Sequence, residues 1–164
     1  MLSSCSLIAS LTIFIAYCAM YIYHHDLPVS LSETFYHVKH RWKFSVCLML
    51  MASLVFVPWI EASERLEFLV FFACFSVFLV AASPQFKEKF VSPIHYGAAG
   101  VMFVSAVTWE IFNGGLYWVL CAFAVLAVLN RRRWVLWLEV GLFLELHISL
   151  LLREVEKAIL FYLC

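Results

Sequence analysis

The sequence predicts an all-α fold: a polytopic transmembrane bundle of about six helices, in a single domain. Of its 164 residues, 65% are hydrophobic and 13% are charged, whereas a soluble domain is about 45–50% apolar and about 25% charged. Apolar runs close to the length that a bilayer requires, about 17–25 residues, recur along the chain. Basic residues also gather in alternate connections between these runs, as they do in membrane proteins.

The expected spans cover most of the chain. They run over about residues 3–23, 44–60, 66–83, 93–112, 116–130 and 134–152. Ser92 and Pro93 are expected to open the fourth span, because serine caps helices and proline is tolerated at the first helical position. Gly114 and Gly115 predict a tight turn before the fifth span. This span is short, reaching only about 22 Å, and the count falls to five spans if it does not cross.

The first connection, residues 24–43, is the one long polar stretch. Within it, Ser30 and Glu33 have the S-x-x-E spacing of a capping box. Apolar residues follow at helical spacing between Leu31 and Val38. These patterns predict a short, ordered, interfacial helix that begins near Leu31.

Lysine and arginine determine the expected orientation. Basic residues are concentrated in alternate connections: Lys39, Arg41 and Lys43 in the first, Lys87 and Lys89 in the third, and Arg131, Arg132 and Arg133 in the fifth. These connections are expected to face the cytoplasm, with both termini outside. The expected location is the inner (cytoplasmic) membrane of a bacterium. Arg153 and Lys157, after the last span, do not follow the pattern.

Ionisable groups inside the spans are the first candidates for function, because each costs about 2.5–3.5 kcal/mol on insertion scales. In the sixth span, Glu139, His147 and Glu154 share one helical face, while Glu145 points nearly the other way. A proton relay or small polar site is one interpretation of the shared face. Structural hydrogen bonding to neighbouring helices is the other.

A second candidate polar site combines the first connection with the fourth span. Ser32 and Glu33 are expected at the same end of the bundle as His95 and Tyr96, within hydrogen-bonding reach. Small residues at positions 97–100 would let another backbone approach closely. The alternative is that His95 only holds the first connection in place.

No metal, cofactor or nucleic-acid partner is expected. The six cysteines include no C-x-x-C pair and the histidines lack metal-ligand spacing. His95 and His147 are expected near opposite membrane faces, which makes them a poor haem pair. The chain has no P-loop or nucleophile elbow. Its formal net charge is +0, so no general basic field attracts nucleic acid. Membrane lipids are the expected partners, and self-association into a homo-oligomer is left open.

Two segments resemble the DRAM/Sfk/Frag-type six-helix membrane proteins. Residues 27–34, LPVSLSET, resemble the stretch after the first helix of that group, and residues 94–99, IHYGAA, resemble its later histidine with small residues. The resemblance implies a role linked to lipid or glycolipid, with Ser32, Glu33 and His95 at the matching positions. The loop is usually non-cytoplasmic in that group, whereas basic residues place it inside here. The whole chain also resembles small six-helix proteins of Bacteroidetes and their phages, which implies no particular activity.

Three functions follow from these patterns. The favoured one is a non-enzymatic membrane protein that acts by packing, association or lipid modulation, because no catalytic motif is present. The second is a lipid-site enzyme or carrier built from the first connection and His95. The third is a small proton-coupled transporter using Glu139 and His147, ranked last because no internal repeat is visible. A lipid-shaped, polar-ended cavity beside His95 would be the most informative observation.

Overall fold

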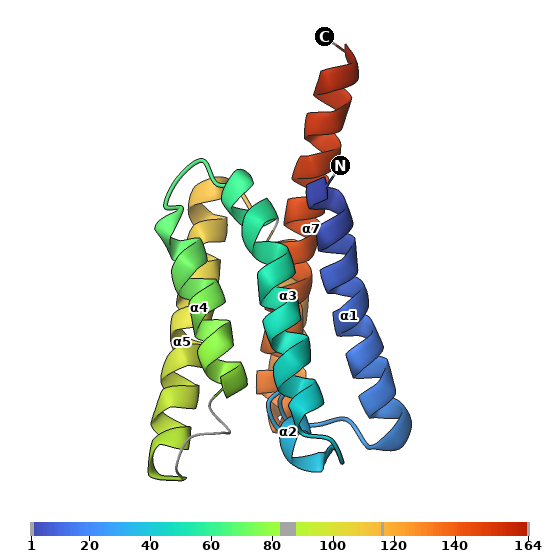
Figure 1. Ribbon diagram of the computed structural model, residues 1–164, viewed down its shortest axis with the longest axis vertical. Coiled ribbons are helices and arrows are strands. Elements are labelled where there is room, and N and C mark those ends of the chain that lie inside the picture. Colours follow the sequence, from blue (N-terminus) through green and yellow to red (C-terminus); the bar gives the residue numbers. More distant parts are fainter. Residues whose placement is uncertain (1, 83–87, 116, 164) are drawn as a thin grey trace.

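A computed structural model describes residues 2–82, 88–115 and 117–163, and the regular structure in these ranges is entirely helical. The elements are α1 (Leu2–His24), α2 (Thr34–His37), α3 (Trp42–Glu61), α4 (Phe68–Ala82), α5 (Glu88–Asn113), α6 (Trp118–Leu129), the 3₁₀ turn η2 (Arg131–Arg133) and α7 (Trp134–Leu163). The long helices run up and down beside one another (Figure 1). The predicted all-α bundle is therefore confirmed.

Three helical segments of the described chain are long and apolar enough to cross a membrane. They are Leu2–His24, Trp42–Glu61 and Arg131–Phe161. The apolar helices α4 and α6 are shorter, with 15 and 12 residues. At 1.5 Å per residue α6 reaches only about 18 Å, so the fifth expected span is shorter than predicted. These lengths are compatible with an integral membrane protein.

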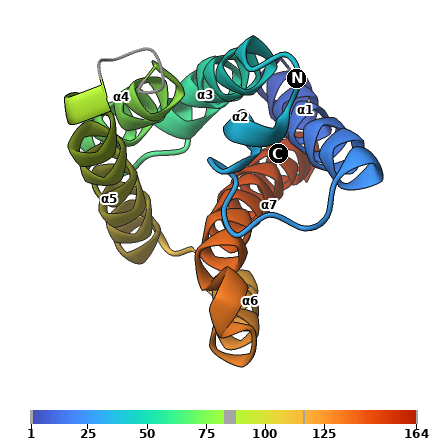
Figure 2. The same ribbon diagram turned by 90° about the horizontal axis from the view of Figure 1, so that it is seen from below.

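The helices form a main bundle with one outlying member. α3 packs against α1 and α4, α4 packs against α5, and α7 contacts α1 and α5. Seen from below, α6 lies outside this group, beside α7 (Figure 2). Gly141 of α7 allows the close approach of α6, because a Cβ atom there would lie 2.4 Å from Cβ of Phe123.

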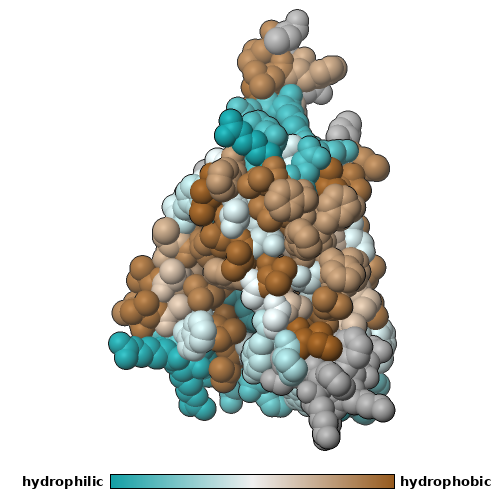
Figure 3. All heavy atoms as spheres, turned by 90° about the vertical axis from the view of Figure 1, so that its left-hand side faces the viewer, coloured by the Kyte–Doolittle hydropathy of each residue, from teal (hydrophilic) through white to brown (hydrophobic). Residues whose placement is uncertain are grey.

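The outer surface of α4 and α5 is strongly apolar. Phe71, Phe72 and Phe75 on α4 and Val104 on α5 are exposed, and hydrophobic side chains dominate this side of the molecule (Figure 3). Soluble monomers rarely expose apolar patches beyond a few hundred Å². Such a face suits contact with lipid tails.

Two helix boundaries differ from the prediction. α5 begins at Glu88 and has Pro93 inside it, so the prediction that Ser92 and Pro93 open this helix is wrong. As the sixth residue of α5, Pro93 lies beyond the four N–H groups that are free at a helix start, so it removes one i→i−4 hydrogen bond. α7 continues beyond residue 152 to Leu163, since no glycine or proline follows to end it. The expected boundaries at Ser83 and Leu116 lie outside the described residues.

The first connection contains the expected short helix, in reduced form. α2 covers only Thr34–His37. The N–H of Glu33 donates to Oγ of Ser30 at 3.2 Å, and Oε2 of Glu33 accepts from the N–H of Val29. This is a reciprocal arrangement like a capping box, with the carboxylate reaching one residue further back than in the standard motif.

Candidate functional site

An elongated cavity of about 120 Å³ lies inside the main bundle. α3, α4, α5 and α7 supply most of its wall, with Phe14 of α1 and the first connection completing it. On α3 the lining extends from Phe44 to Trp59, a helix length of about 22 Å. Most lining side chains are aliphatic or aromatic, so the cavity offers a narrow apolar space.

Polar groups are concentrated at the end of the cavity beside the first connection. Ser32, His95 and Glu139 all line it. His95 lies early in α5 and Glu139 lies early in α7. Oε2 of Glu139 accepts a 2.7 Å hydrogen bond from the N–H of Leu31, which fixes this end of α7 against the connection. The cavity is therefore apolar along its length and polar at one end.

The first connection is held over this end by several hydrogen bonds. The hydroxyl groups of Tyr17 and Thr34 lie 2.6 Å apart. Nε of Arg133 donates to the carbonyl oxygen of Leu27 at 3.1 Å. The N–H of Leu136 donates to the carbonyl oxygen of Val29 at 3.2 Å. Lipid offers no partners for a polar backbone. The bundle supplies those partners, and the connection becomes part of the cavity wall.

His147 lines the middle of the cavity and links two helices. Nδ1 lies 2.9 Å from the carbonyl oxygen of Phe143, and Nε2 lies 3.0 Å from Oγ of Ser10 on α1. A carbonyl oxygen only accepts, so Nδ1 donates and Nε2 of the neutral ring accepts from the serine hydroxyl. Both ring nitrogens are engaged in helix packing.

The two candidate sites of the sequence analysis thus meet in one cavity. Ser32 and His95 from one, and Glu139 and His147 from the other, share its wall. Side-chain periodicity gives the face of each helix and cannot show which faces converge.

The expected site residues Glu33, Tyr96 and Glu154 are not among the residues that line this wall. Tyr96 is 73% exposed. Oγ of Ser32 bonds to that of Ser30 at 3.1 Å, while Glu33 bonds to Val29. Glu154 pairs with Lys157 at 3.1 Å near the far end of α7. The side chain of Glu139, which was not assigned to the first connection, contacts the backbone of that connection.

A second buried polar cluster lies where α5, α6 and α7 meet. Oε1 of Glu145 accepts from the N–H of Tyr117 at 2.9 Å, and Oε2 accepts from that of Leu120 at 3.1 Å. Ser149 donates toward Glu110 at 3.3 Å and toward Glu145 at 3.4 Å. Oε1 of Glu110 is buried without a hydrogen-bond partner among the described residues. Glu145 therefore caps the start of α6, whose first N–H groups have no partner within the helix.

Sequence reasoning missed the relationship of this cluster to the glycine turn. Gly114 has φ +75°, and the N–H of Gly115 donates to the carbonyl oxygen of Glu110 at 2.8 Å, as in a Schellman motif. A Cβ atom on Gly115 would lie 1.9 Å from Oε2 of Glu110. The glycine pair was a usable signal, because a tight turn after Glu110 returns the chain toward that carboxylate.

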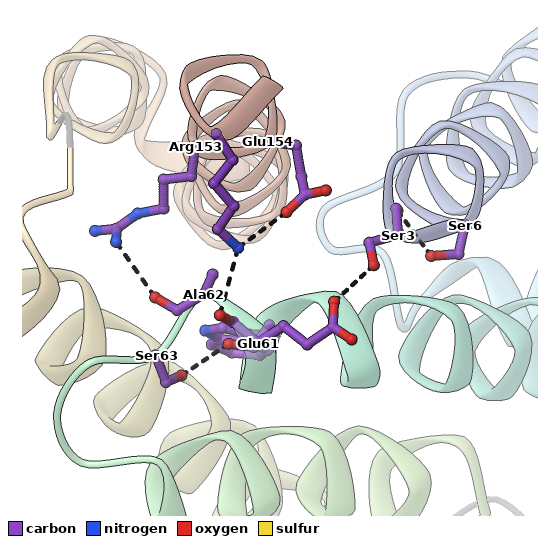
Figure 4. Close-up of polar contacts among 9 residues, drawn as sticks. Ser3, Ser6, Glu61, Ala62, Ser63, Arg153 and Glu154 are labelled. Carbon is purple, nitrogen blue, oxygen red and sulfur yellow. Dashed lines mark hydrogen bonds and ion pairs between the residues drawn. The ribbon is translucent and has the colours of Figure 1, made fainter. Parts of the chain in front are cut away.

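Polar contacts also join the opposite end of the bundle. Arg153 and Glu154 project from α7 beside the end of α3 (Figure 4). Arg153 donates to the carbonyl oxygen of Ala62 at 3.3 Å, and Ser3 of α1 donates to Oε2 of Glu61 at 2.6 Å. These bonds tie α1 and α7 to the same end of α3.

The described residues contain no group of three or more histidine, cysteine or acidic side chains that could hold a metal ion. The fold and cavity define a class: a helical bundle, with segments long and apolar enough to span a membrane, around a largely apolar cavity with polar groups at one end. Comparisons of the chain with models of protein families, with curated proteins and with solved structures found no match.

Proposed function

We propose that the chain is a non-enzymatic membrane protein that crosses the bilayer six times and binds a single-chain amphiphile in its cavity. The observation that carries this proposal is the shape and polarity of that cavity. Its wall is apolar along α3 and α5, while Ser32, His95 and Glu139 lie at one end. Ligand sites typically combine an apolar lining with a few convergent polar groups. A molecule with one apolar tail and one polar head matches this arrangement.

The size of the cavity favours a slender tail. A water molecule needs about 10–15 Å³ by this measure, so 120 Å³ corresponds to roughly ten such volumes. The stretch lined only by aliphatic and aromatic side chains offers water no hydrogen-bond partners. At about 24 cal/mol per Å³, leaving it empty would cost about 3 kcal/mol. An alkyl chain drawn from the membrane would remove most of that cost.

Two of the polar lining residues belong to the segments that resemble DRAM/Sfk/Frag-type proteins. Ser32 and His95 stand at the matching positions, and both line the cavity. That resemblance implies a lipid-linked role, which agrees with an amphiphile as ligand. Membrane lipids are accordingly the proposed partners.

The positions of the basic connections support the proposed topology. Ser45, early in α3, donates to the carbonyl oxygen of Ala81 near the end of α4 at 2.7 Å, and Arg133 contacts Leu27. The first, third and fifth connections therefore leave the same end of the bundle. Asn113, at the opposite end, accepts from the N–H of Glu64 at 2.9 Å. We place the basic end in the cytoplasm of a bacterial inner membrane, with both termini outside.

The short helix α6 is compatible with a sixth crossing because the free backbone N–H groups at its start have hydrogen-bond partners in the protein. Its N-terminal N–H groups bond to Glu145, eleven residues into α7. α6 thus begins at a depth about 16 Å along α7, inside the apolar region. Irregular backbone is tolerated at such depth only where protein surrounds it.

Photo-crosslinking tests the ligand proposal. The purified protein in nanodiscs is incubated with a fatty acid that carries a diazirine at its tail end, and adducts are mapped by mass spectrometry. Adducts are expected on deep lining residues such as Trp59 and Ala106. Ala99→Phe, which fills the cavity from α5, should abolish them. Val101→Phe is the matched control, because Val101 is on the same helix and is 45% exposed.

Adducts confined to lipid-facing residues such as Phe75, or equal labelling in the Ala99 and Val101 variants, would refute the proposal. Circular dichroism and gel filtration of both variants show whether each retains the helical fold.

A further inference from the structure

The cavity wall carries an uneven distribution of charge. Among the side chains that the structure describes, Glu139 is the one carboxylate that lines the cavity, and no lysine or arginine lines it. The other titratable lining residues are His95, His147 and Cys74. Both nitrogens of His147 are hydrogen-bonded to protein. Among the described side chains of the wall, Glu139 is therefore the one acidic group that a bound head would meet.

Glu139 retains binding capacity for a ligand. Its Oε2 accepts from the N–H of Leu31, but no hydrogen bond to its Oε1 comes from the described residues. A carboxylate has about four acceptor sites over its two oxygens. The side chain is partly accessible rather than sealed in the core, and it lines the cavity. Glu139 can therefore accept hydrogen bonds from a molecule inside.

We propose that the amphiphile bound in the cavity carries a primary amine head that pairs with Glu139. An ammonium group has three donors and no acceptor, so it complements a carboxylate with free acceptor sites. Ser32 provides a further oxygen beside it. No described lysine or arginine side chain lines the cavity to offset the repulsion between Glu139 and a carboxylate or phosphate head. This inference rests on the proposed function, which supplies the bound tail.

Competition among matched heads tests the inference. Dodecylamine, dodecan-1-ol and dodecanoate have the same chain, and each is used to displace the diazirine probe from the protein in nanodiscs. The amine is expected to compete about tenfold better than dodecanoate, with the alcohol between them. In Glu139→Gln that preference should disappear. The amide oxygen of the variant still accepts from Leu31, so the first connection stays in place. Glu154→Gln, on the same helix and outside the cavity, should keep the preference.

The outcomes separate the two proposals. Equal competition by all three heads, stronger competition by dodecanoate, or an unchanged preference in Glu139→Gln would overturn the amine assignment and leave tail binding intact. Absence of adducts in the wild-type cavity, both with the fatty-acid probe and with a diazirine probe that carries an amine head, would overturn the bound tail itself.

Discussion

Glu145 of α7 accepts a 2.9 Å hydrogen bond from the backbone N–H of Tyr117, so one helix caps the next. Tyr117 has φ 53°, a left-handed conformation that is costly for a residue with a side chain. Its hydroxyl group donates to the carbonyl oxygen of Glu110 at 2.6 Å. The N–H of Leu120 also donates to Glu145, at 3.1 Å. Three hydrogen bonds to α5 and α7 therefore hold the turn into α6.

Removing this cap should destabilise the protein. Glu145→Ala leaves two part-buried N–H groups without their capping partner, and we expect a loss of about 1–3 kcal/mol in the free energy of unfolding. Glu145→Gln keeps an acceptor oxygen and should lose less. The measurement is equilibrium unfolding by SDS in mixed micelles. Glu154→Ala breaks an exposed pair with Lys157 and should cost at most about 1 kcal/mol; a similar loss in both alanine variants would contradict the capping role.

Two glycines in helices should respond to alanine in opposite directions. Gly141→Ala places a Cβ atom 2.4 Å from Phe123, which should push α6 from α7 and lower stability by about 1–3 kcal/mol. Gly100→Ala meets nothing within 4 Å, so the better helix propensity should raise stability by up to about 1 kcal/mol. The same unfolding assay compares them. Equal effects would show that close packing at Gly141 is unimportant.

Composition and apolar run length were sufficient to predict a helical bundle, because 65% hydrophobic residues leave few alternatives. The glycine turn after α5 was also predictable, since Gly114 adopts the positive φ that glycine tolerates. The start of α5 was mispredicted because Pro93 suits a first helical position but is also tolerated inside a helix. Local signals of this kind do not determine where a helix begins.

The sequence named four of the cavity's polar residues without showing that they share a cavity. Glu139 and His147 were chosen because ionisable groups inside spans are costly, and Ser32 and His95 because they were expected at the same end of the bundle. Their convergence depends on how α5 and α7 are rotated and packed, which helical periodicity alone does not determine. Glu145 was assigned to the opposite face of its helix, and the partner it caps became visible only with α6 in place.

The contact between His147 and Ser10 should contribute measurably to packing of α1 on α7. A double-mutant cycle with His147→Ala and Ser10→Ala isolates the term that belongs to their 3.0 Å hydrogen bond. Polar bonds between membrane helices average about 0.6 kcal/mol in such cycles, and we expect a coupling of that order. Ser53 donates to the carbonyl oxygen of Met49 in its own helix. The losses of stability from Ser53→Ala and His147→Ala should therefore be additive. Additivity for Ser10 as well would mean that the hydrogen bond contributes nothing.

The proposed topology predicts opposite accessibility for two connections. Arg132 and Glu64 are both exposed, and Arg132 belongs to the basic end of the bundle while Glu64 lies beside Asn113 at the other. In a background with the native cysteines replaced, Glu64→Cys should react with a membrane-impermeant maleimide added to spheroplasts. Arg132→Cys should react only after the membrane is permeabilised, because basic connections remain in the cytoplasm. Labelling of both cysteines from outside would contradict six crossings with the basic end inside, and the reversed pattern would invert the orientation while keeping the two ends on opposite faces.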